Sequence, residues 1–281
     1  MKVGFYLFSD FHSNPDAASS RIRGQWLINH WPEAERINYA VKYDAIIYQK
    51  VYEVRHARVY QGIKILDVCD PDWLHYKEPF IEMVEECDAV TVPTEVLRRT
   101  VQGWTKKPVI VIPDRHDLDY FKEEKIHRGR AKEVCWFGYS QNHSVLKAAR
   151  KCLIENELAI SLISDKPIIL SECELGINLN ERFTAWNLET VNKEIIKSDF
   201  VIMPGSRNPN HRFKSNNKIV HSWLLKMPVA NCIEDLERFI DPAERQKEAD
   251  KNYEIAIRDY DVRSSVKEMQ ELIEKLRKEK K

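Results

Sequence analysis

The stretch 213–231 reads Phe213-Lys-Ser-Asn-Asn-Lys-Ile-Val-His-Ser-Trp-Leu-Leu-Lys-Met-Pro-Val-Ala-Asn231 and is the most informative part of the chain. It opens with polar and cationic residues, continues as an apolar-periodic helix, and ends in a turn into a short buried strand. Small polar residues cap helix N-termini, and a helix N-terminus carries a partial positive charge that can hold an anion. The stretch therefore predicts a diphosphate site at the mouth of an α/β sheet, with an ordinary capped helix as the alternative.

Length and composition are those of a soluble protein with well-formed cores. The 281 residues suit two domains, and 43% of them are hydrophobic. No run of about 18 uncharged apolar residues occurs, so stable membrane insertion is not expected. The six cysteines form no C-x-x-C pair, which argues against a zinc site or disulfide framework and for a cytoplasmic location.

Charge argues against a dedicated nucleic-acid binder. The formal net charge is zero. Residues 1–125 contain 17 basic and 20 acidic residues, and residues 126–281 contain 27 and 24. Neither half has the strong basic excess that such proteins show, although a local basic face is still compatible with these counts.

Short apolar runs alternate with helical patterns, which predicts βαβ units and parallel sheets. The first series has strands at 3–8, 44–48, 63–68, 89–92 and 109–112, and helices at 20–30 and 79–86. A charged, irregular region follows at 114–130. The second series has strands at 134–137, 158–163, 168–170, 200–203 and 228–231, and helices at 144–155, 188–197, 217–225 and 233–240. A long charged helical stretch, 242–281, ends the chain.

This pattern predicts the α/β class with two Rossmann-like domains facing across a cleft. The expected domains are residues 1–125 and 126–281, with the boundary within 118–132. The last helix has two alternatives, to stay with the second domain or to cross back to the first. Ligands of such sheets bind beyond the carboxyl ends of the strands.

Five segments, in this order, resemble motifs of the retaining GT-B glycosyltransferases of the group 1 type. They are 88–98 (DAVTVPTEVLR), 109–121 (VIVIPDRHDLDYF), 134–138 (VCWFG), 194–204 (EIIKSDFVIMP) and 215–230 (SNNKIVHSWLLKMPVA). The outline is also similar to that of the small phage DNA-modifying glucosyltransferases. The chain departs from the family pattern at His221, where the family has a glutamate, and at Asp114-Arg115, where it has Asn-Gly.

The resemblance implies a nucleotide-sugar donor in the second domain, expected to be UDP-linked, and no separate cofactor. The glycine of the 138–142 loop would let the backbone approach the donor phosphates, and nearby cations would stabilise the leaving diphosphate. No metal is expected, because the helix N-terminus and the cations supply the positive charge. The candidate donor-binding residues are Gly138, Ser140, Asn142, Trp186, Arg212, Lys214, Ser215, Asn216, Asn217, Lys218 and His221.

Candidates on the acceptor side follow the strands of the first domain. An acceptor hydroxyl can lose its proton to a positioned carboxylate or histidine. Asp70 is the first candidate for this base and Asp72 the second, with Asp10 and His12 as further candidates. The alternative for Asp70-Pro-Asp72 is a turn or a helix cap. Arg21 and Arg23 are candidates for binding a donor phosphate or an anionic acceptor.

Two classes of function fit these features. The first is an enzyme that moves a sugar from a nucleotide-sugar to a hydroxyl, either of a saccharide or lipid-linked glycan or of a hydroxymethylated pyrimidine in DNA. The second is a non-catalytic GT-B-like protein that binds a nucleotide or a sugar. The sequence leaves open the donor sugar, the base, the acceptor, the stereochemical outcome and the oligomeric state.

Overall fold

The computed structural model describes residues 1–10, 17–167, 181–205 and 209–280. The chain divides into two compact units, and each has its own parallel sheet. Unit 1 comprises Met1–Asp117, Asn210–Asn216 and Tyr260–Lys281, whereas unit 2 comprises Leu118–Pro209 and Asn217–Asp259. The first division falls after Asp117, upstream of the expected boundary at 125. The expected strand at 168–170 lies outside the described residues.

The sheet of unit 1 has six described strands, and every adjacent pair is parallel. Their spatial order is β2 (Ala34–Arg36), β1 (Val3–Leu7), β3 (Ala45–Gln49), β4 (Ile63–Asp67), β5 (Ala89–Val92) and β6 (Val109–Val111). All except β2 overlap strands expected from the sequence. β2 is a three-residue edge strand that is only partly buried, so it has no apolar run to reveal it.

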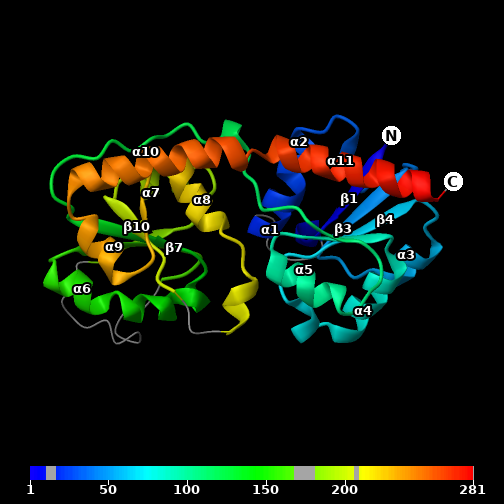
Figure 1. Cartoon of the computed structure of the whole chain (residues 1–281), viewed down its shortest axis with the longest axis horizontal. Helices are drawn as coiled ribbons and strands as arrows, with labels where there is room; N and C mark the ends of the chain where they lie inside the picture. Colours follow the sequence, from blue (N-terminus) through cyan, green and yellow to red (C-terminus); the bar gives the residue numbers. More distant parts are fainter. Residues whose placement is uncertain (11–16, 168–180, 206–208, 281) are drawn as a thin grey trace. The chain divides into compact units, whose positions relative to one another are not determined.

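Helices cover both faces of this sheet (Figure 1). The described α-helices of unit 1 are α1 (Ala18–Ser20), α2 (Trp26–Asn29), α3 (Val54–Val59), α4 (Lys77–Glu86), α5 (Glu95–Gln102) and α11 (Val262–Glu279). α11 packs against α2 and β4, while α3 and α4 lie together on the other face. The apolar face of α11 predicted from the sequence is buried, because Met269, Leu272, Ile273 and Leu276 are nearly inaccessible.

The sheet of unit 2 has five described parallel strands. Their order is β11 (Val229–Ala230), β10 (Phe200–Ile202), β7 (Glu133–Phe137), β8 (Ala159–Ser164) and β9 (Glu181–Ala185). Successive residues of a strand face opposite sides. Val134 and Trp136 accordingly join the core under α6 (Arg150–Glu155) and α9 (Ile233–Arg238), and Cys135 and Phe137 join the core under α7 (Val191–Ile195).

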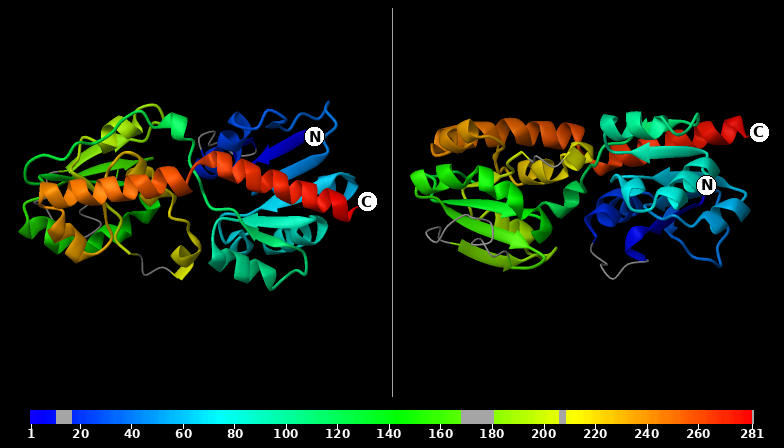
Figure 2. Two further views of the ribbon diagram at one scale, coloured as in Figure 1. Left: turned by 45° about the horizontal axis from the view of Figure 1, so that its top comes forward. Right: turned by 90° about the horizontal axis from the view of Figure 1, so that it is seen from below.

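The expected helical stretch 242–281 is two helices, α10 (Pro242–Asp259) in unit 2 and α11 in unit 1 (Figure 2). The chain leaves the helical conformation at Asp261, whose carboxylate accepts a hydrogen bond from the Arg263 N–H at 2.9 Å and so caps α11. A continuous charged pattern conceals such a break. Among the helices of the described ranges, none has the length and apolar character needed to cross a bilayer.

Candidate functional site

The structure brings Gly138 and Lys218 together at the carboxyl edge of the unit 2 sheet. β7 ends at Phe137, and Gly138 follows with a φ of +156°. A side chain at position 138 would collide with the Lys218 ammonium, which also lies 5.5 Å from the centroid of the Trp136 ring. Lys218 is in the first turn of α8 (Asn217–Leu224). This arrangement, which we call the Lys218 seat, places a cation at a helix N-terminus beside bare backbone.

The loop after Gly138 is held by a residue that sequence reasoning missed. Asp165 Oδ1 accepts hydrogen bonds from the Ser140 N–H at 2.7 Å and from the Ser164 hydroxyl at 3.1 Å. Burial tends to raise the pKa of Asp165, but these hydrogen bonds outweigh it and lower the pKa. The Ser140 N–H is therefore already used by a carboxylate. The Asn142 N–H donates to the Tyr139 carbonyl at 2.9 Å.

Trp186 lies beside the Lys218 seat. It directly follows β9, and its N–H donates to the Ser164 carbonyl at 2.8 Å. Its half-buried ring stacks on Phe137, with centroids 6.3 Å apart and planes 30° apart. Since Phe137 immediately precedes Gly138, Trp186 is placed at the same sheet edge as the seat, where a planar base can meet an aromatic surface.

His221 belongs to the interior of unit 2. Its side chain is buried, and Nε2 lies 2.9 Å from Asn192 Oδ1. The rings of Phe121, Phe137 and Tyr120 surround it, the nearest with its centroid at 4.9 Å. This burial argues against the direct donor contact expected for His221, and instead indicates that the histidine packs α8 against its neighbours.

The segment Lys214–Asn216 belongs to unit 1. The Lys214 ammonium pairs with Asp70, the Ser215 hydroxyl donates to Asp114 Oδ2 at 2.5 Å, and the Asn216 amide donates to the Tyr260 hydroxyl at 2.8 Å. The phosphate contacts predicted for Lys214, Ser215 and Asn216 stay predictions, and the structure assigns these three residues to unit 1 rather than to the second domain. Within unit 1 these polar groups already have partners, and α8 begins only at Asn217.

A buried aromatic residue anchors this segment. Phe213 is 4% exposed and packs edge-on against Trp73, with ring centroids 5.3 Å apart. The preceding Arg212 is exposed, and its guanidinium lies over the Phe213 ring at 4.8 Å. Burial of Phe213 explains why the segment stays with unit 1, although the residues on both sides of it belong to unit 2.

Asp70 and Asp72 form a charged group with Lys50, Tyr52 and Lys214, here called the Asp70 cluster. Lys50 Nζ lies 2.6 Å from Asp70 Oδ2 and 3.5 Å from Asp72 Oδ1. The Tyr52 hydroxyl donates to Asp72 Oδ2 at 2.6 Å. Lys50 directly follows β3 and has a φ of +53°, a conformation that costs a non-glycine residue energy. Sequence reasoning missed Lys50, because nothing in Tyr48-Gln49-Lys50 signals that conformation.

The two carboxylates of the Asp70 cluster differ in pKa. Burial tends to raise the pKa of Asp70, but the charges of Lys50 and Lys214 outweigh it and lower the pKa below 3.8. Burial raises the pKa of Asp72, and Lys50 and the Tyr52 hydrogen bond oppose this only in part. Asp70 is therefore firmly ionised at neutral pH, whereas Asp72 binds a proton more readily.

Arg23 is buried in the interior of unit 1. Its buried guanidinium makes a bidentate pair with Asp67, at 2.6 and 2.8 Å, and a further pair with Asp114 at 2.7 Å. This bonding argues against Arg23 as an anion-binding residue. Arg21 is half-buried and lies over the Trp26 ring at 5.6 Å.

Asp10 is tied to its own surroundings in unit 1. It accepts a hydrogen bond from the Leu7 N–H at 3.3 Å and pairs with Arg36 at 3.1 Å. His12 lies outside the described residues. The roles predicted for Asp10 and His12 as alternative bases stay predictions.

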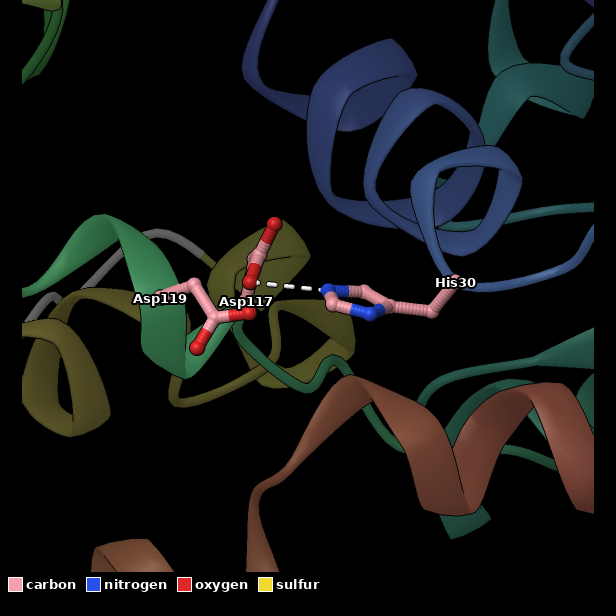
Figure 3. Close-up of side chains that lie close together, drawn as sticks. All are labelled: His30, Asp117 and Asp119. Atoms are coloured by element: carbon pink, nitrogen blue, oxygen red, sulfur yellow. Dashed lines mark hydrogen bonds and ion pairs between the residues drawn. The ribbon is translucent and has the colours of Figure 1, made fainter.

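A histidine–carboxylate pair closes the end of unit 1. His30 Nε2 lies 2.9 Å from Asp117 Oδ1, as Figure 3 shows; Asp119, also drawn there, belongs to unit 2. The pair links His30, which directly follows α2, to Asp117, the last residue of the Met1–Asp117 segment of unit 1. Within unit 1 it is a hydrogen-bonded pair of two side chains, and the expectation of a metal-free reaction stays a prediction.

The two parallel sheets with their helices have the GT-B fold, as expected from the sequence. HepE from Anabaena, solved in complex with UDP-glucose, is similar at a TM-score of 0.66 and 11% identity, over 98% of this chain and 100% of that one. The DNA-modifying enzyme β-glucosyltransferase, solved with and without UDP-glucose, is similar at a TM-score of 0.62 and 10% identity, over 98% of this chain and 99% of that one. AviGT4, a glycosyltransferase of avilamycin A biosynthesis, is similar at a TM-score of 0.61 and 10% identity, over 98% of each chain. No family model and no curated protein matches the sequence.

Proposed function

We propose that this chain is a glycosyltransferase that moves a sugar from a UDP-sugar to a hydroxyl of an acceptor. The observation that carries the proposal is the Lys218 seat. A nucleoside diphosphate departs with developing negative charge, and a fixed ammonium at a helix N-terminus stabilises that charge without reorganisation. Two solved proteins of the same fold bind UDP-glucose, which supports UDP as the nucleotide.

The Asp70 cluster supplies the acceptor-side chemistry in this proposal. An ionised carboxylate can take the proton of the attacking hydroxyl or stabilise positive charge on the sugar. Asp70 is ionised because two lysines hold its pKa low. Asp72, with its raised pKa, is the stronger proton acceptor of the two. The acceptor class is either a saccharide or a hydroxymethylated pyrimidine of DNA.

Calorimetric titration of the full chain with UDP, followed by assay of UDP release from UDP-glucose and other UDP-sugars, tests the proposal. Binding together with slow donor hydrolysis is expected. UDP binding without any hydrolysis or transfer would favour the non-catalytic alternative. Absence of UDP binding would refute the proposed donor.

The pH dependence of transfer distinguishes the two candidate bases. If Asp70 acts, the rate should stay flat as the pH is lowered from about 7 to about 5, because a carboxyl with a lowered pKa stays ionised throughout this range. Its acid limb then lies below 3.8, the usual value for an aspartate. We expect this flat profile for kcat/KM at saturating donor. An acid limb at a pH above that of an ordinary aspartate would assign the proton transfer to Asp72, whose pKa is raised.

A further inference from the structure

Unit 1 contains an aromatic cavity that shares no residue with the Asp70 cluster. Its volume is about 220 Å³, and it lies between the connection from β2 to β3 and the helix α3. The lining consists of Ile37, Asn38, Tyr39, Val41, Lys42, Tyr43, Ile46, His56 and Tyr60. We call this cavity the Tyr39 pocket. The lining thus includes three tyrosines and a histidine, all of them rings that also carry polar groups.

The walls of the pocket are preformed. Tyr43 anchors the 37–43 connection, because its hydroxyl donates to Glu35 and accepts from the Asn38 N–H, both at 2.9 Å. The Tyr60 hydroxyl donates to the Tyr43 carbonyl, also at 2.9 Å. Gly4 of β1 leaves room for the Tyr43 ring to lie directly on the strand. These bonds fix both sides of the pocket, so little ordering is needed when a ligand binds.

Tyr39 lines the pocket with an exposed ring that packs against a neighbouring tyrosine. It is 77% exposed, yet its ring packs edge-on against Tyr6, with centroids 6.1 Å apart. Burial, and then a hydrogen bond with Tyr39, raise the pKa of Tyr6. His56 and Tyr60, which also line the pocket, stack on one another with their planes 13° apart. A flat ligand thus meets several aromatic rings.

The polar groups of the lining include several hydrogen-bond donors. His56 Nδ1 lies 2.8 Å from the Tyr48 hydroxyl, which leaves Nε2 as the other ring nitrogen. Burial lowers the pKa of His56, although Glu53 opposes this, so the ring is neutral at neutral pH. Lys42 and the Asn38 amide add further N–H donors, and no carboxylate lines the pocket. The complementary ligand has apolar faces and a rim of oxygen acceptors.

We propose that the Tyr39 pocket binds a single pyranose ring of a saccharide acceptor. A pyranose has C–H faces that pack on aromatic rings and hydroxyls that accept from N–H donors. The cavity is smaller than the ~300–1,000 Å³ of pockets for drug-sized ligands, which suits one ring rather than a chain of them. The proposal rests on the proposed function and deepens it, since it selects a saccharide over DNA as the acceptor.

The test uses the full chain and a panel of methyl pyranosides, namely those of glucose, galactose, mannose and N-acetylglucosamine. Saturation-transfer NMR should detect binding of at least one of them, with the strongest transfer to protons of one ring face. In the Tyr39→Ala variant the dissociation constant should rise by roughly tenfold, the scale of a lost aromatic contact. The Tyr39 side chain is largely exposed, so this variant should fold like the wild type and lose only the small stabilisation of its contact with Tyr6.

Val59→Ala is the matched control. Val59 is 71% exposed, lies at the end of α3 and does not line the pocket, so this variant should bind the pyranosides like the wild type. The proposal is overturned if no pyranoside binds, if Tyr39→Ala binds as well as the wild type, or if 5-hydroxymethyl-2′-deoxycytidine binds in their place.

Titration of the same samples with UDP keeps the two ideas apart. UDP binding without pyranoside binding would overturn the pocket alone and leave the proposed function standing. Pyranoside binding that needs Tyr39, without UDP binding, would refute the proposed function and support the pocket as a sugar site.

Discussion

Replacing Asp70 by asparagine is expected to lower the rate of sugar transfer by on the order of 10²-fold or more while UDP affinity is unchanged. Asparagine keeps the shape of the side chain and removes its charge, so it neither accepts the proton of the acceptor nor stabilises positive charge on the sugar. UDP affinity should survive because the proposed UDP contacts are those of the Lys218 seat, and neither Asp70 nor Lys50 belongs to it. Single-turnover transfer and calorimetric titration with UDP measure the two quantities.

The variant should also lose stability, and this effect must be separated from the catalytic one. Lys50 is largely buried and pairs with Asp70 at 2.6 Å, so the substitution leaves its ammonium with only the more distant Asp72. We expect a loss of about 1–3 kcal/mol in the free energy of unfolding. Transfer is therefore measured at a temperature where thermal unfolding shows both proteins to be folded.

Lys214→Met is the matched control for Asp70→Asn. It removes the other ion pair of Asp70, but the Lys214 side chain is 54% exposed, so stability should change little. Asp72→Asn tests whether the neighbouring carboxylate can substitute. If Asp70→Asn, Asp72→Asn and the double variant all keep wild-type turnover, the cluster is structural and the base lies elsewhere, with Asp10 and His12 as the next candidates.

Most strands of both sheets were predictable because a parallel strand covered on both faces is a short, largely apolar run. Val90 and Val92 of β5 and Val134 and Trp136 of β7 are almost inaccessible. The edge strands β2 and β9 escaped prediction, because β2 has only three residues and the sequence of β9, Glu-Arg-Phe-Thr-Ala, has no apolar run. The GT-B fold followed from the order of the motifs.

The candidate site was less predictable, because it depends on which of two units a segment joins. The sequence places Lys214 and Lys218 four residues apart, in one cationic group. The structure gives them different partners, since burial of Phe213 keeps Lys214 beside Asp70 in unit 1, whereas Lys218 lies beside Gly138 in unit 2. Lys50 and Asp165 likewise have partners, Asp70 and Ser140, that follow other strands and are 20 or more residues away in the sequence. No local pattern reports such partners.

Replacing Lys218 by alanine is expected to weaken UDP binding by about 1–3 kcal/mol, the scale of a charge-assisted hydrogen bond. This corresponds to roughly a 5- to 150-fold rise in the dissociation constant. The reason is local to unit 2: the Lys218 ammonium lies against Gly138 and over Trp136, at the edge where ligands of parallel sheets bind. Calorimetric titration with UDP measures the change.

Lys214→Ala is the control that separates this structure from the sequence-based expectation. If both lysines bound the diphosphate, the two variants would lose similar affinity. Because Lys214 pairs with Asp70 within unit 1, we expect its removal to leave UDP affinity nearly unchanged. Gly138→Ala should also weaken UDP binding, because a methyl group at position 138 pushes the Lys218 ammonium aside. Equal losses for Lys214→Ala and Lys218→Ala would show that the diphosphate contacts both lysines, and unchanged affinity in Lys218→Ala would remove the seat from the mechanism.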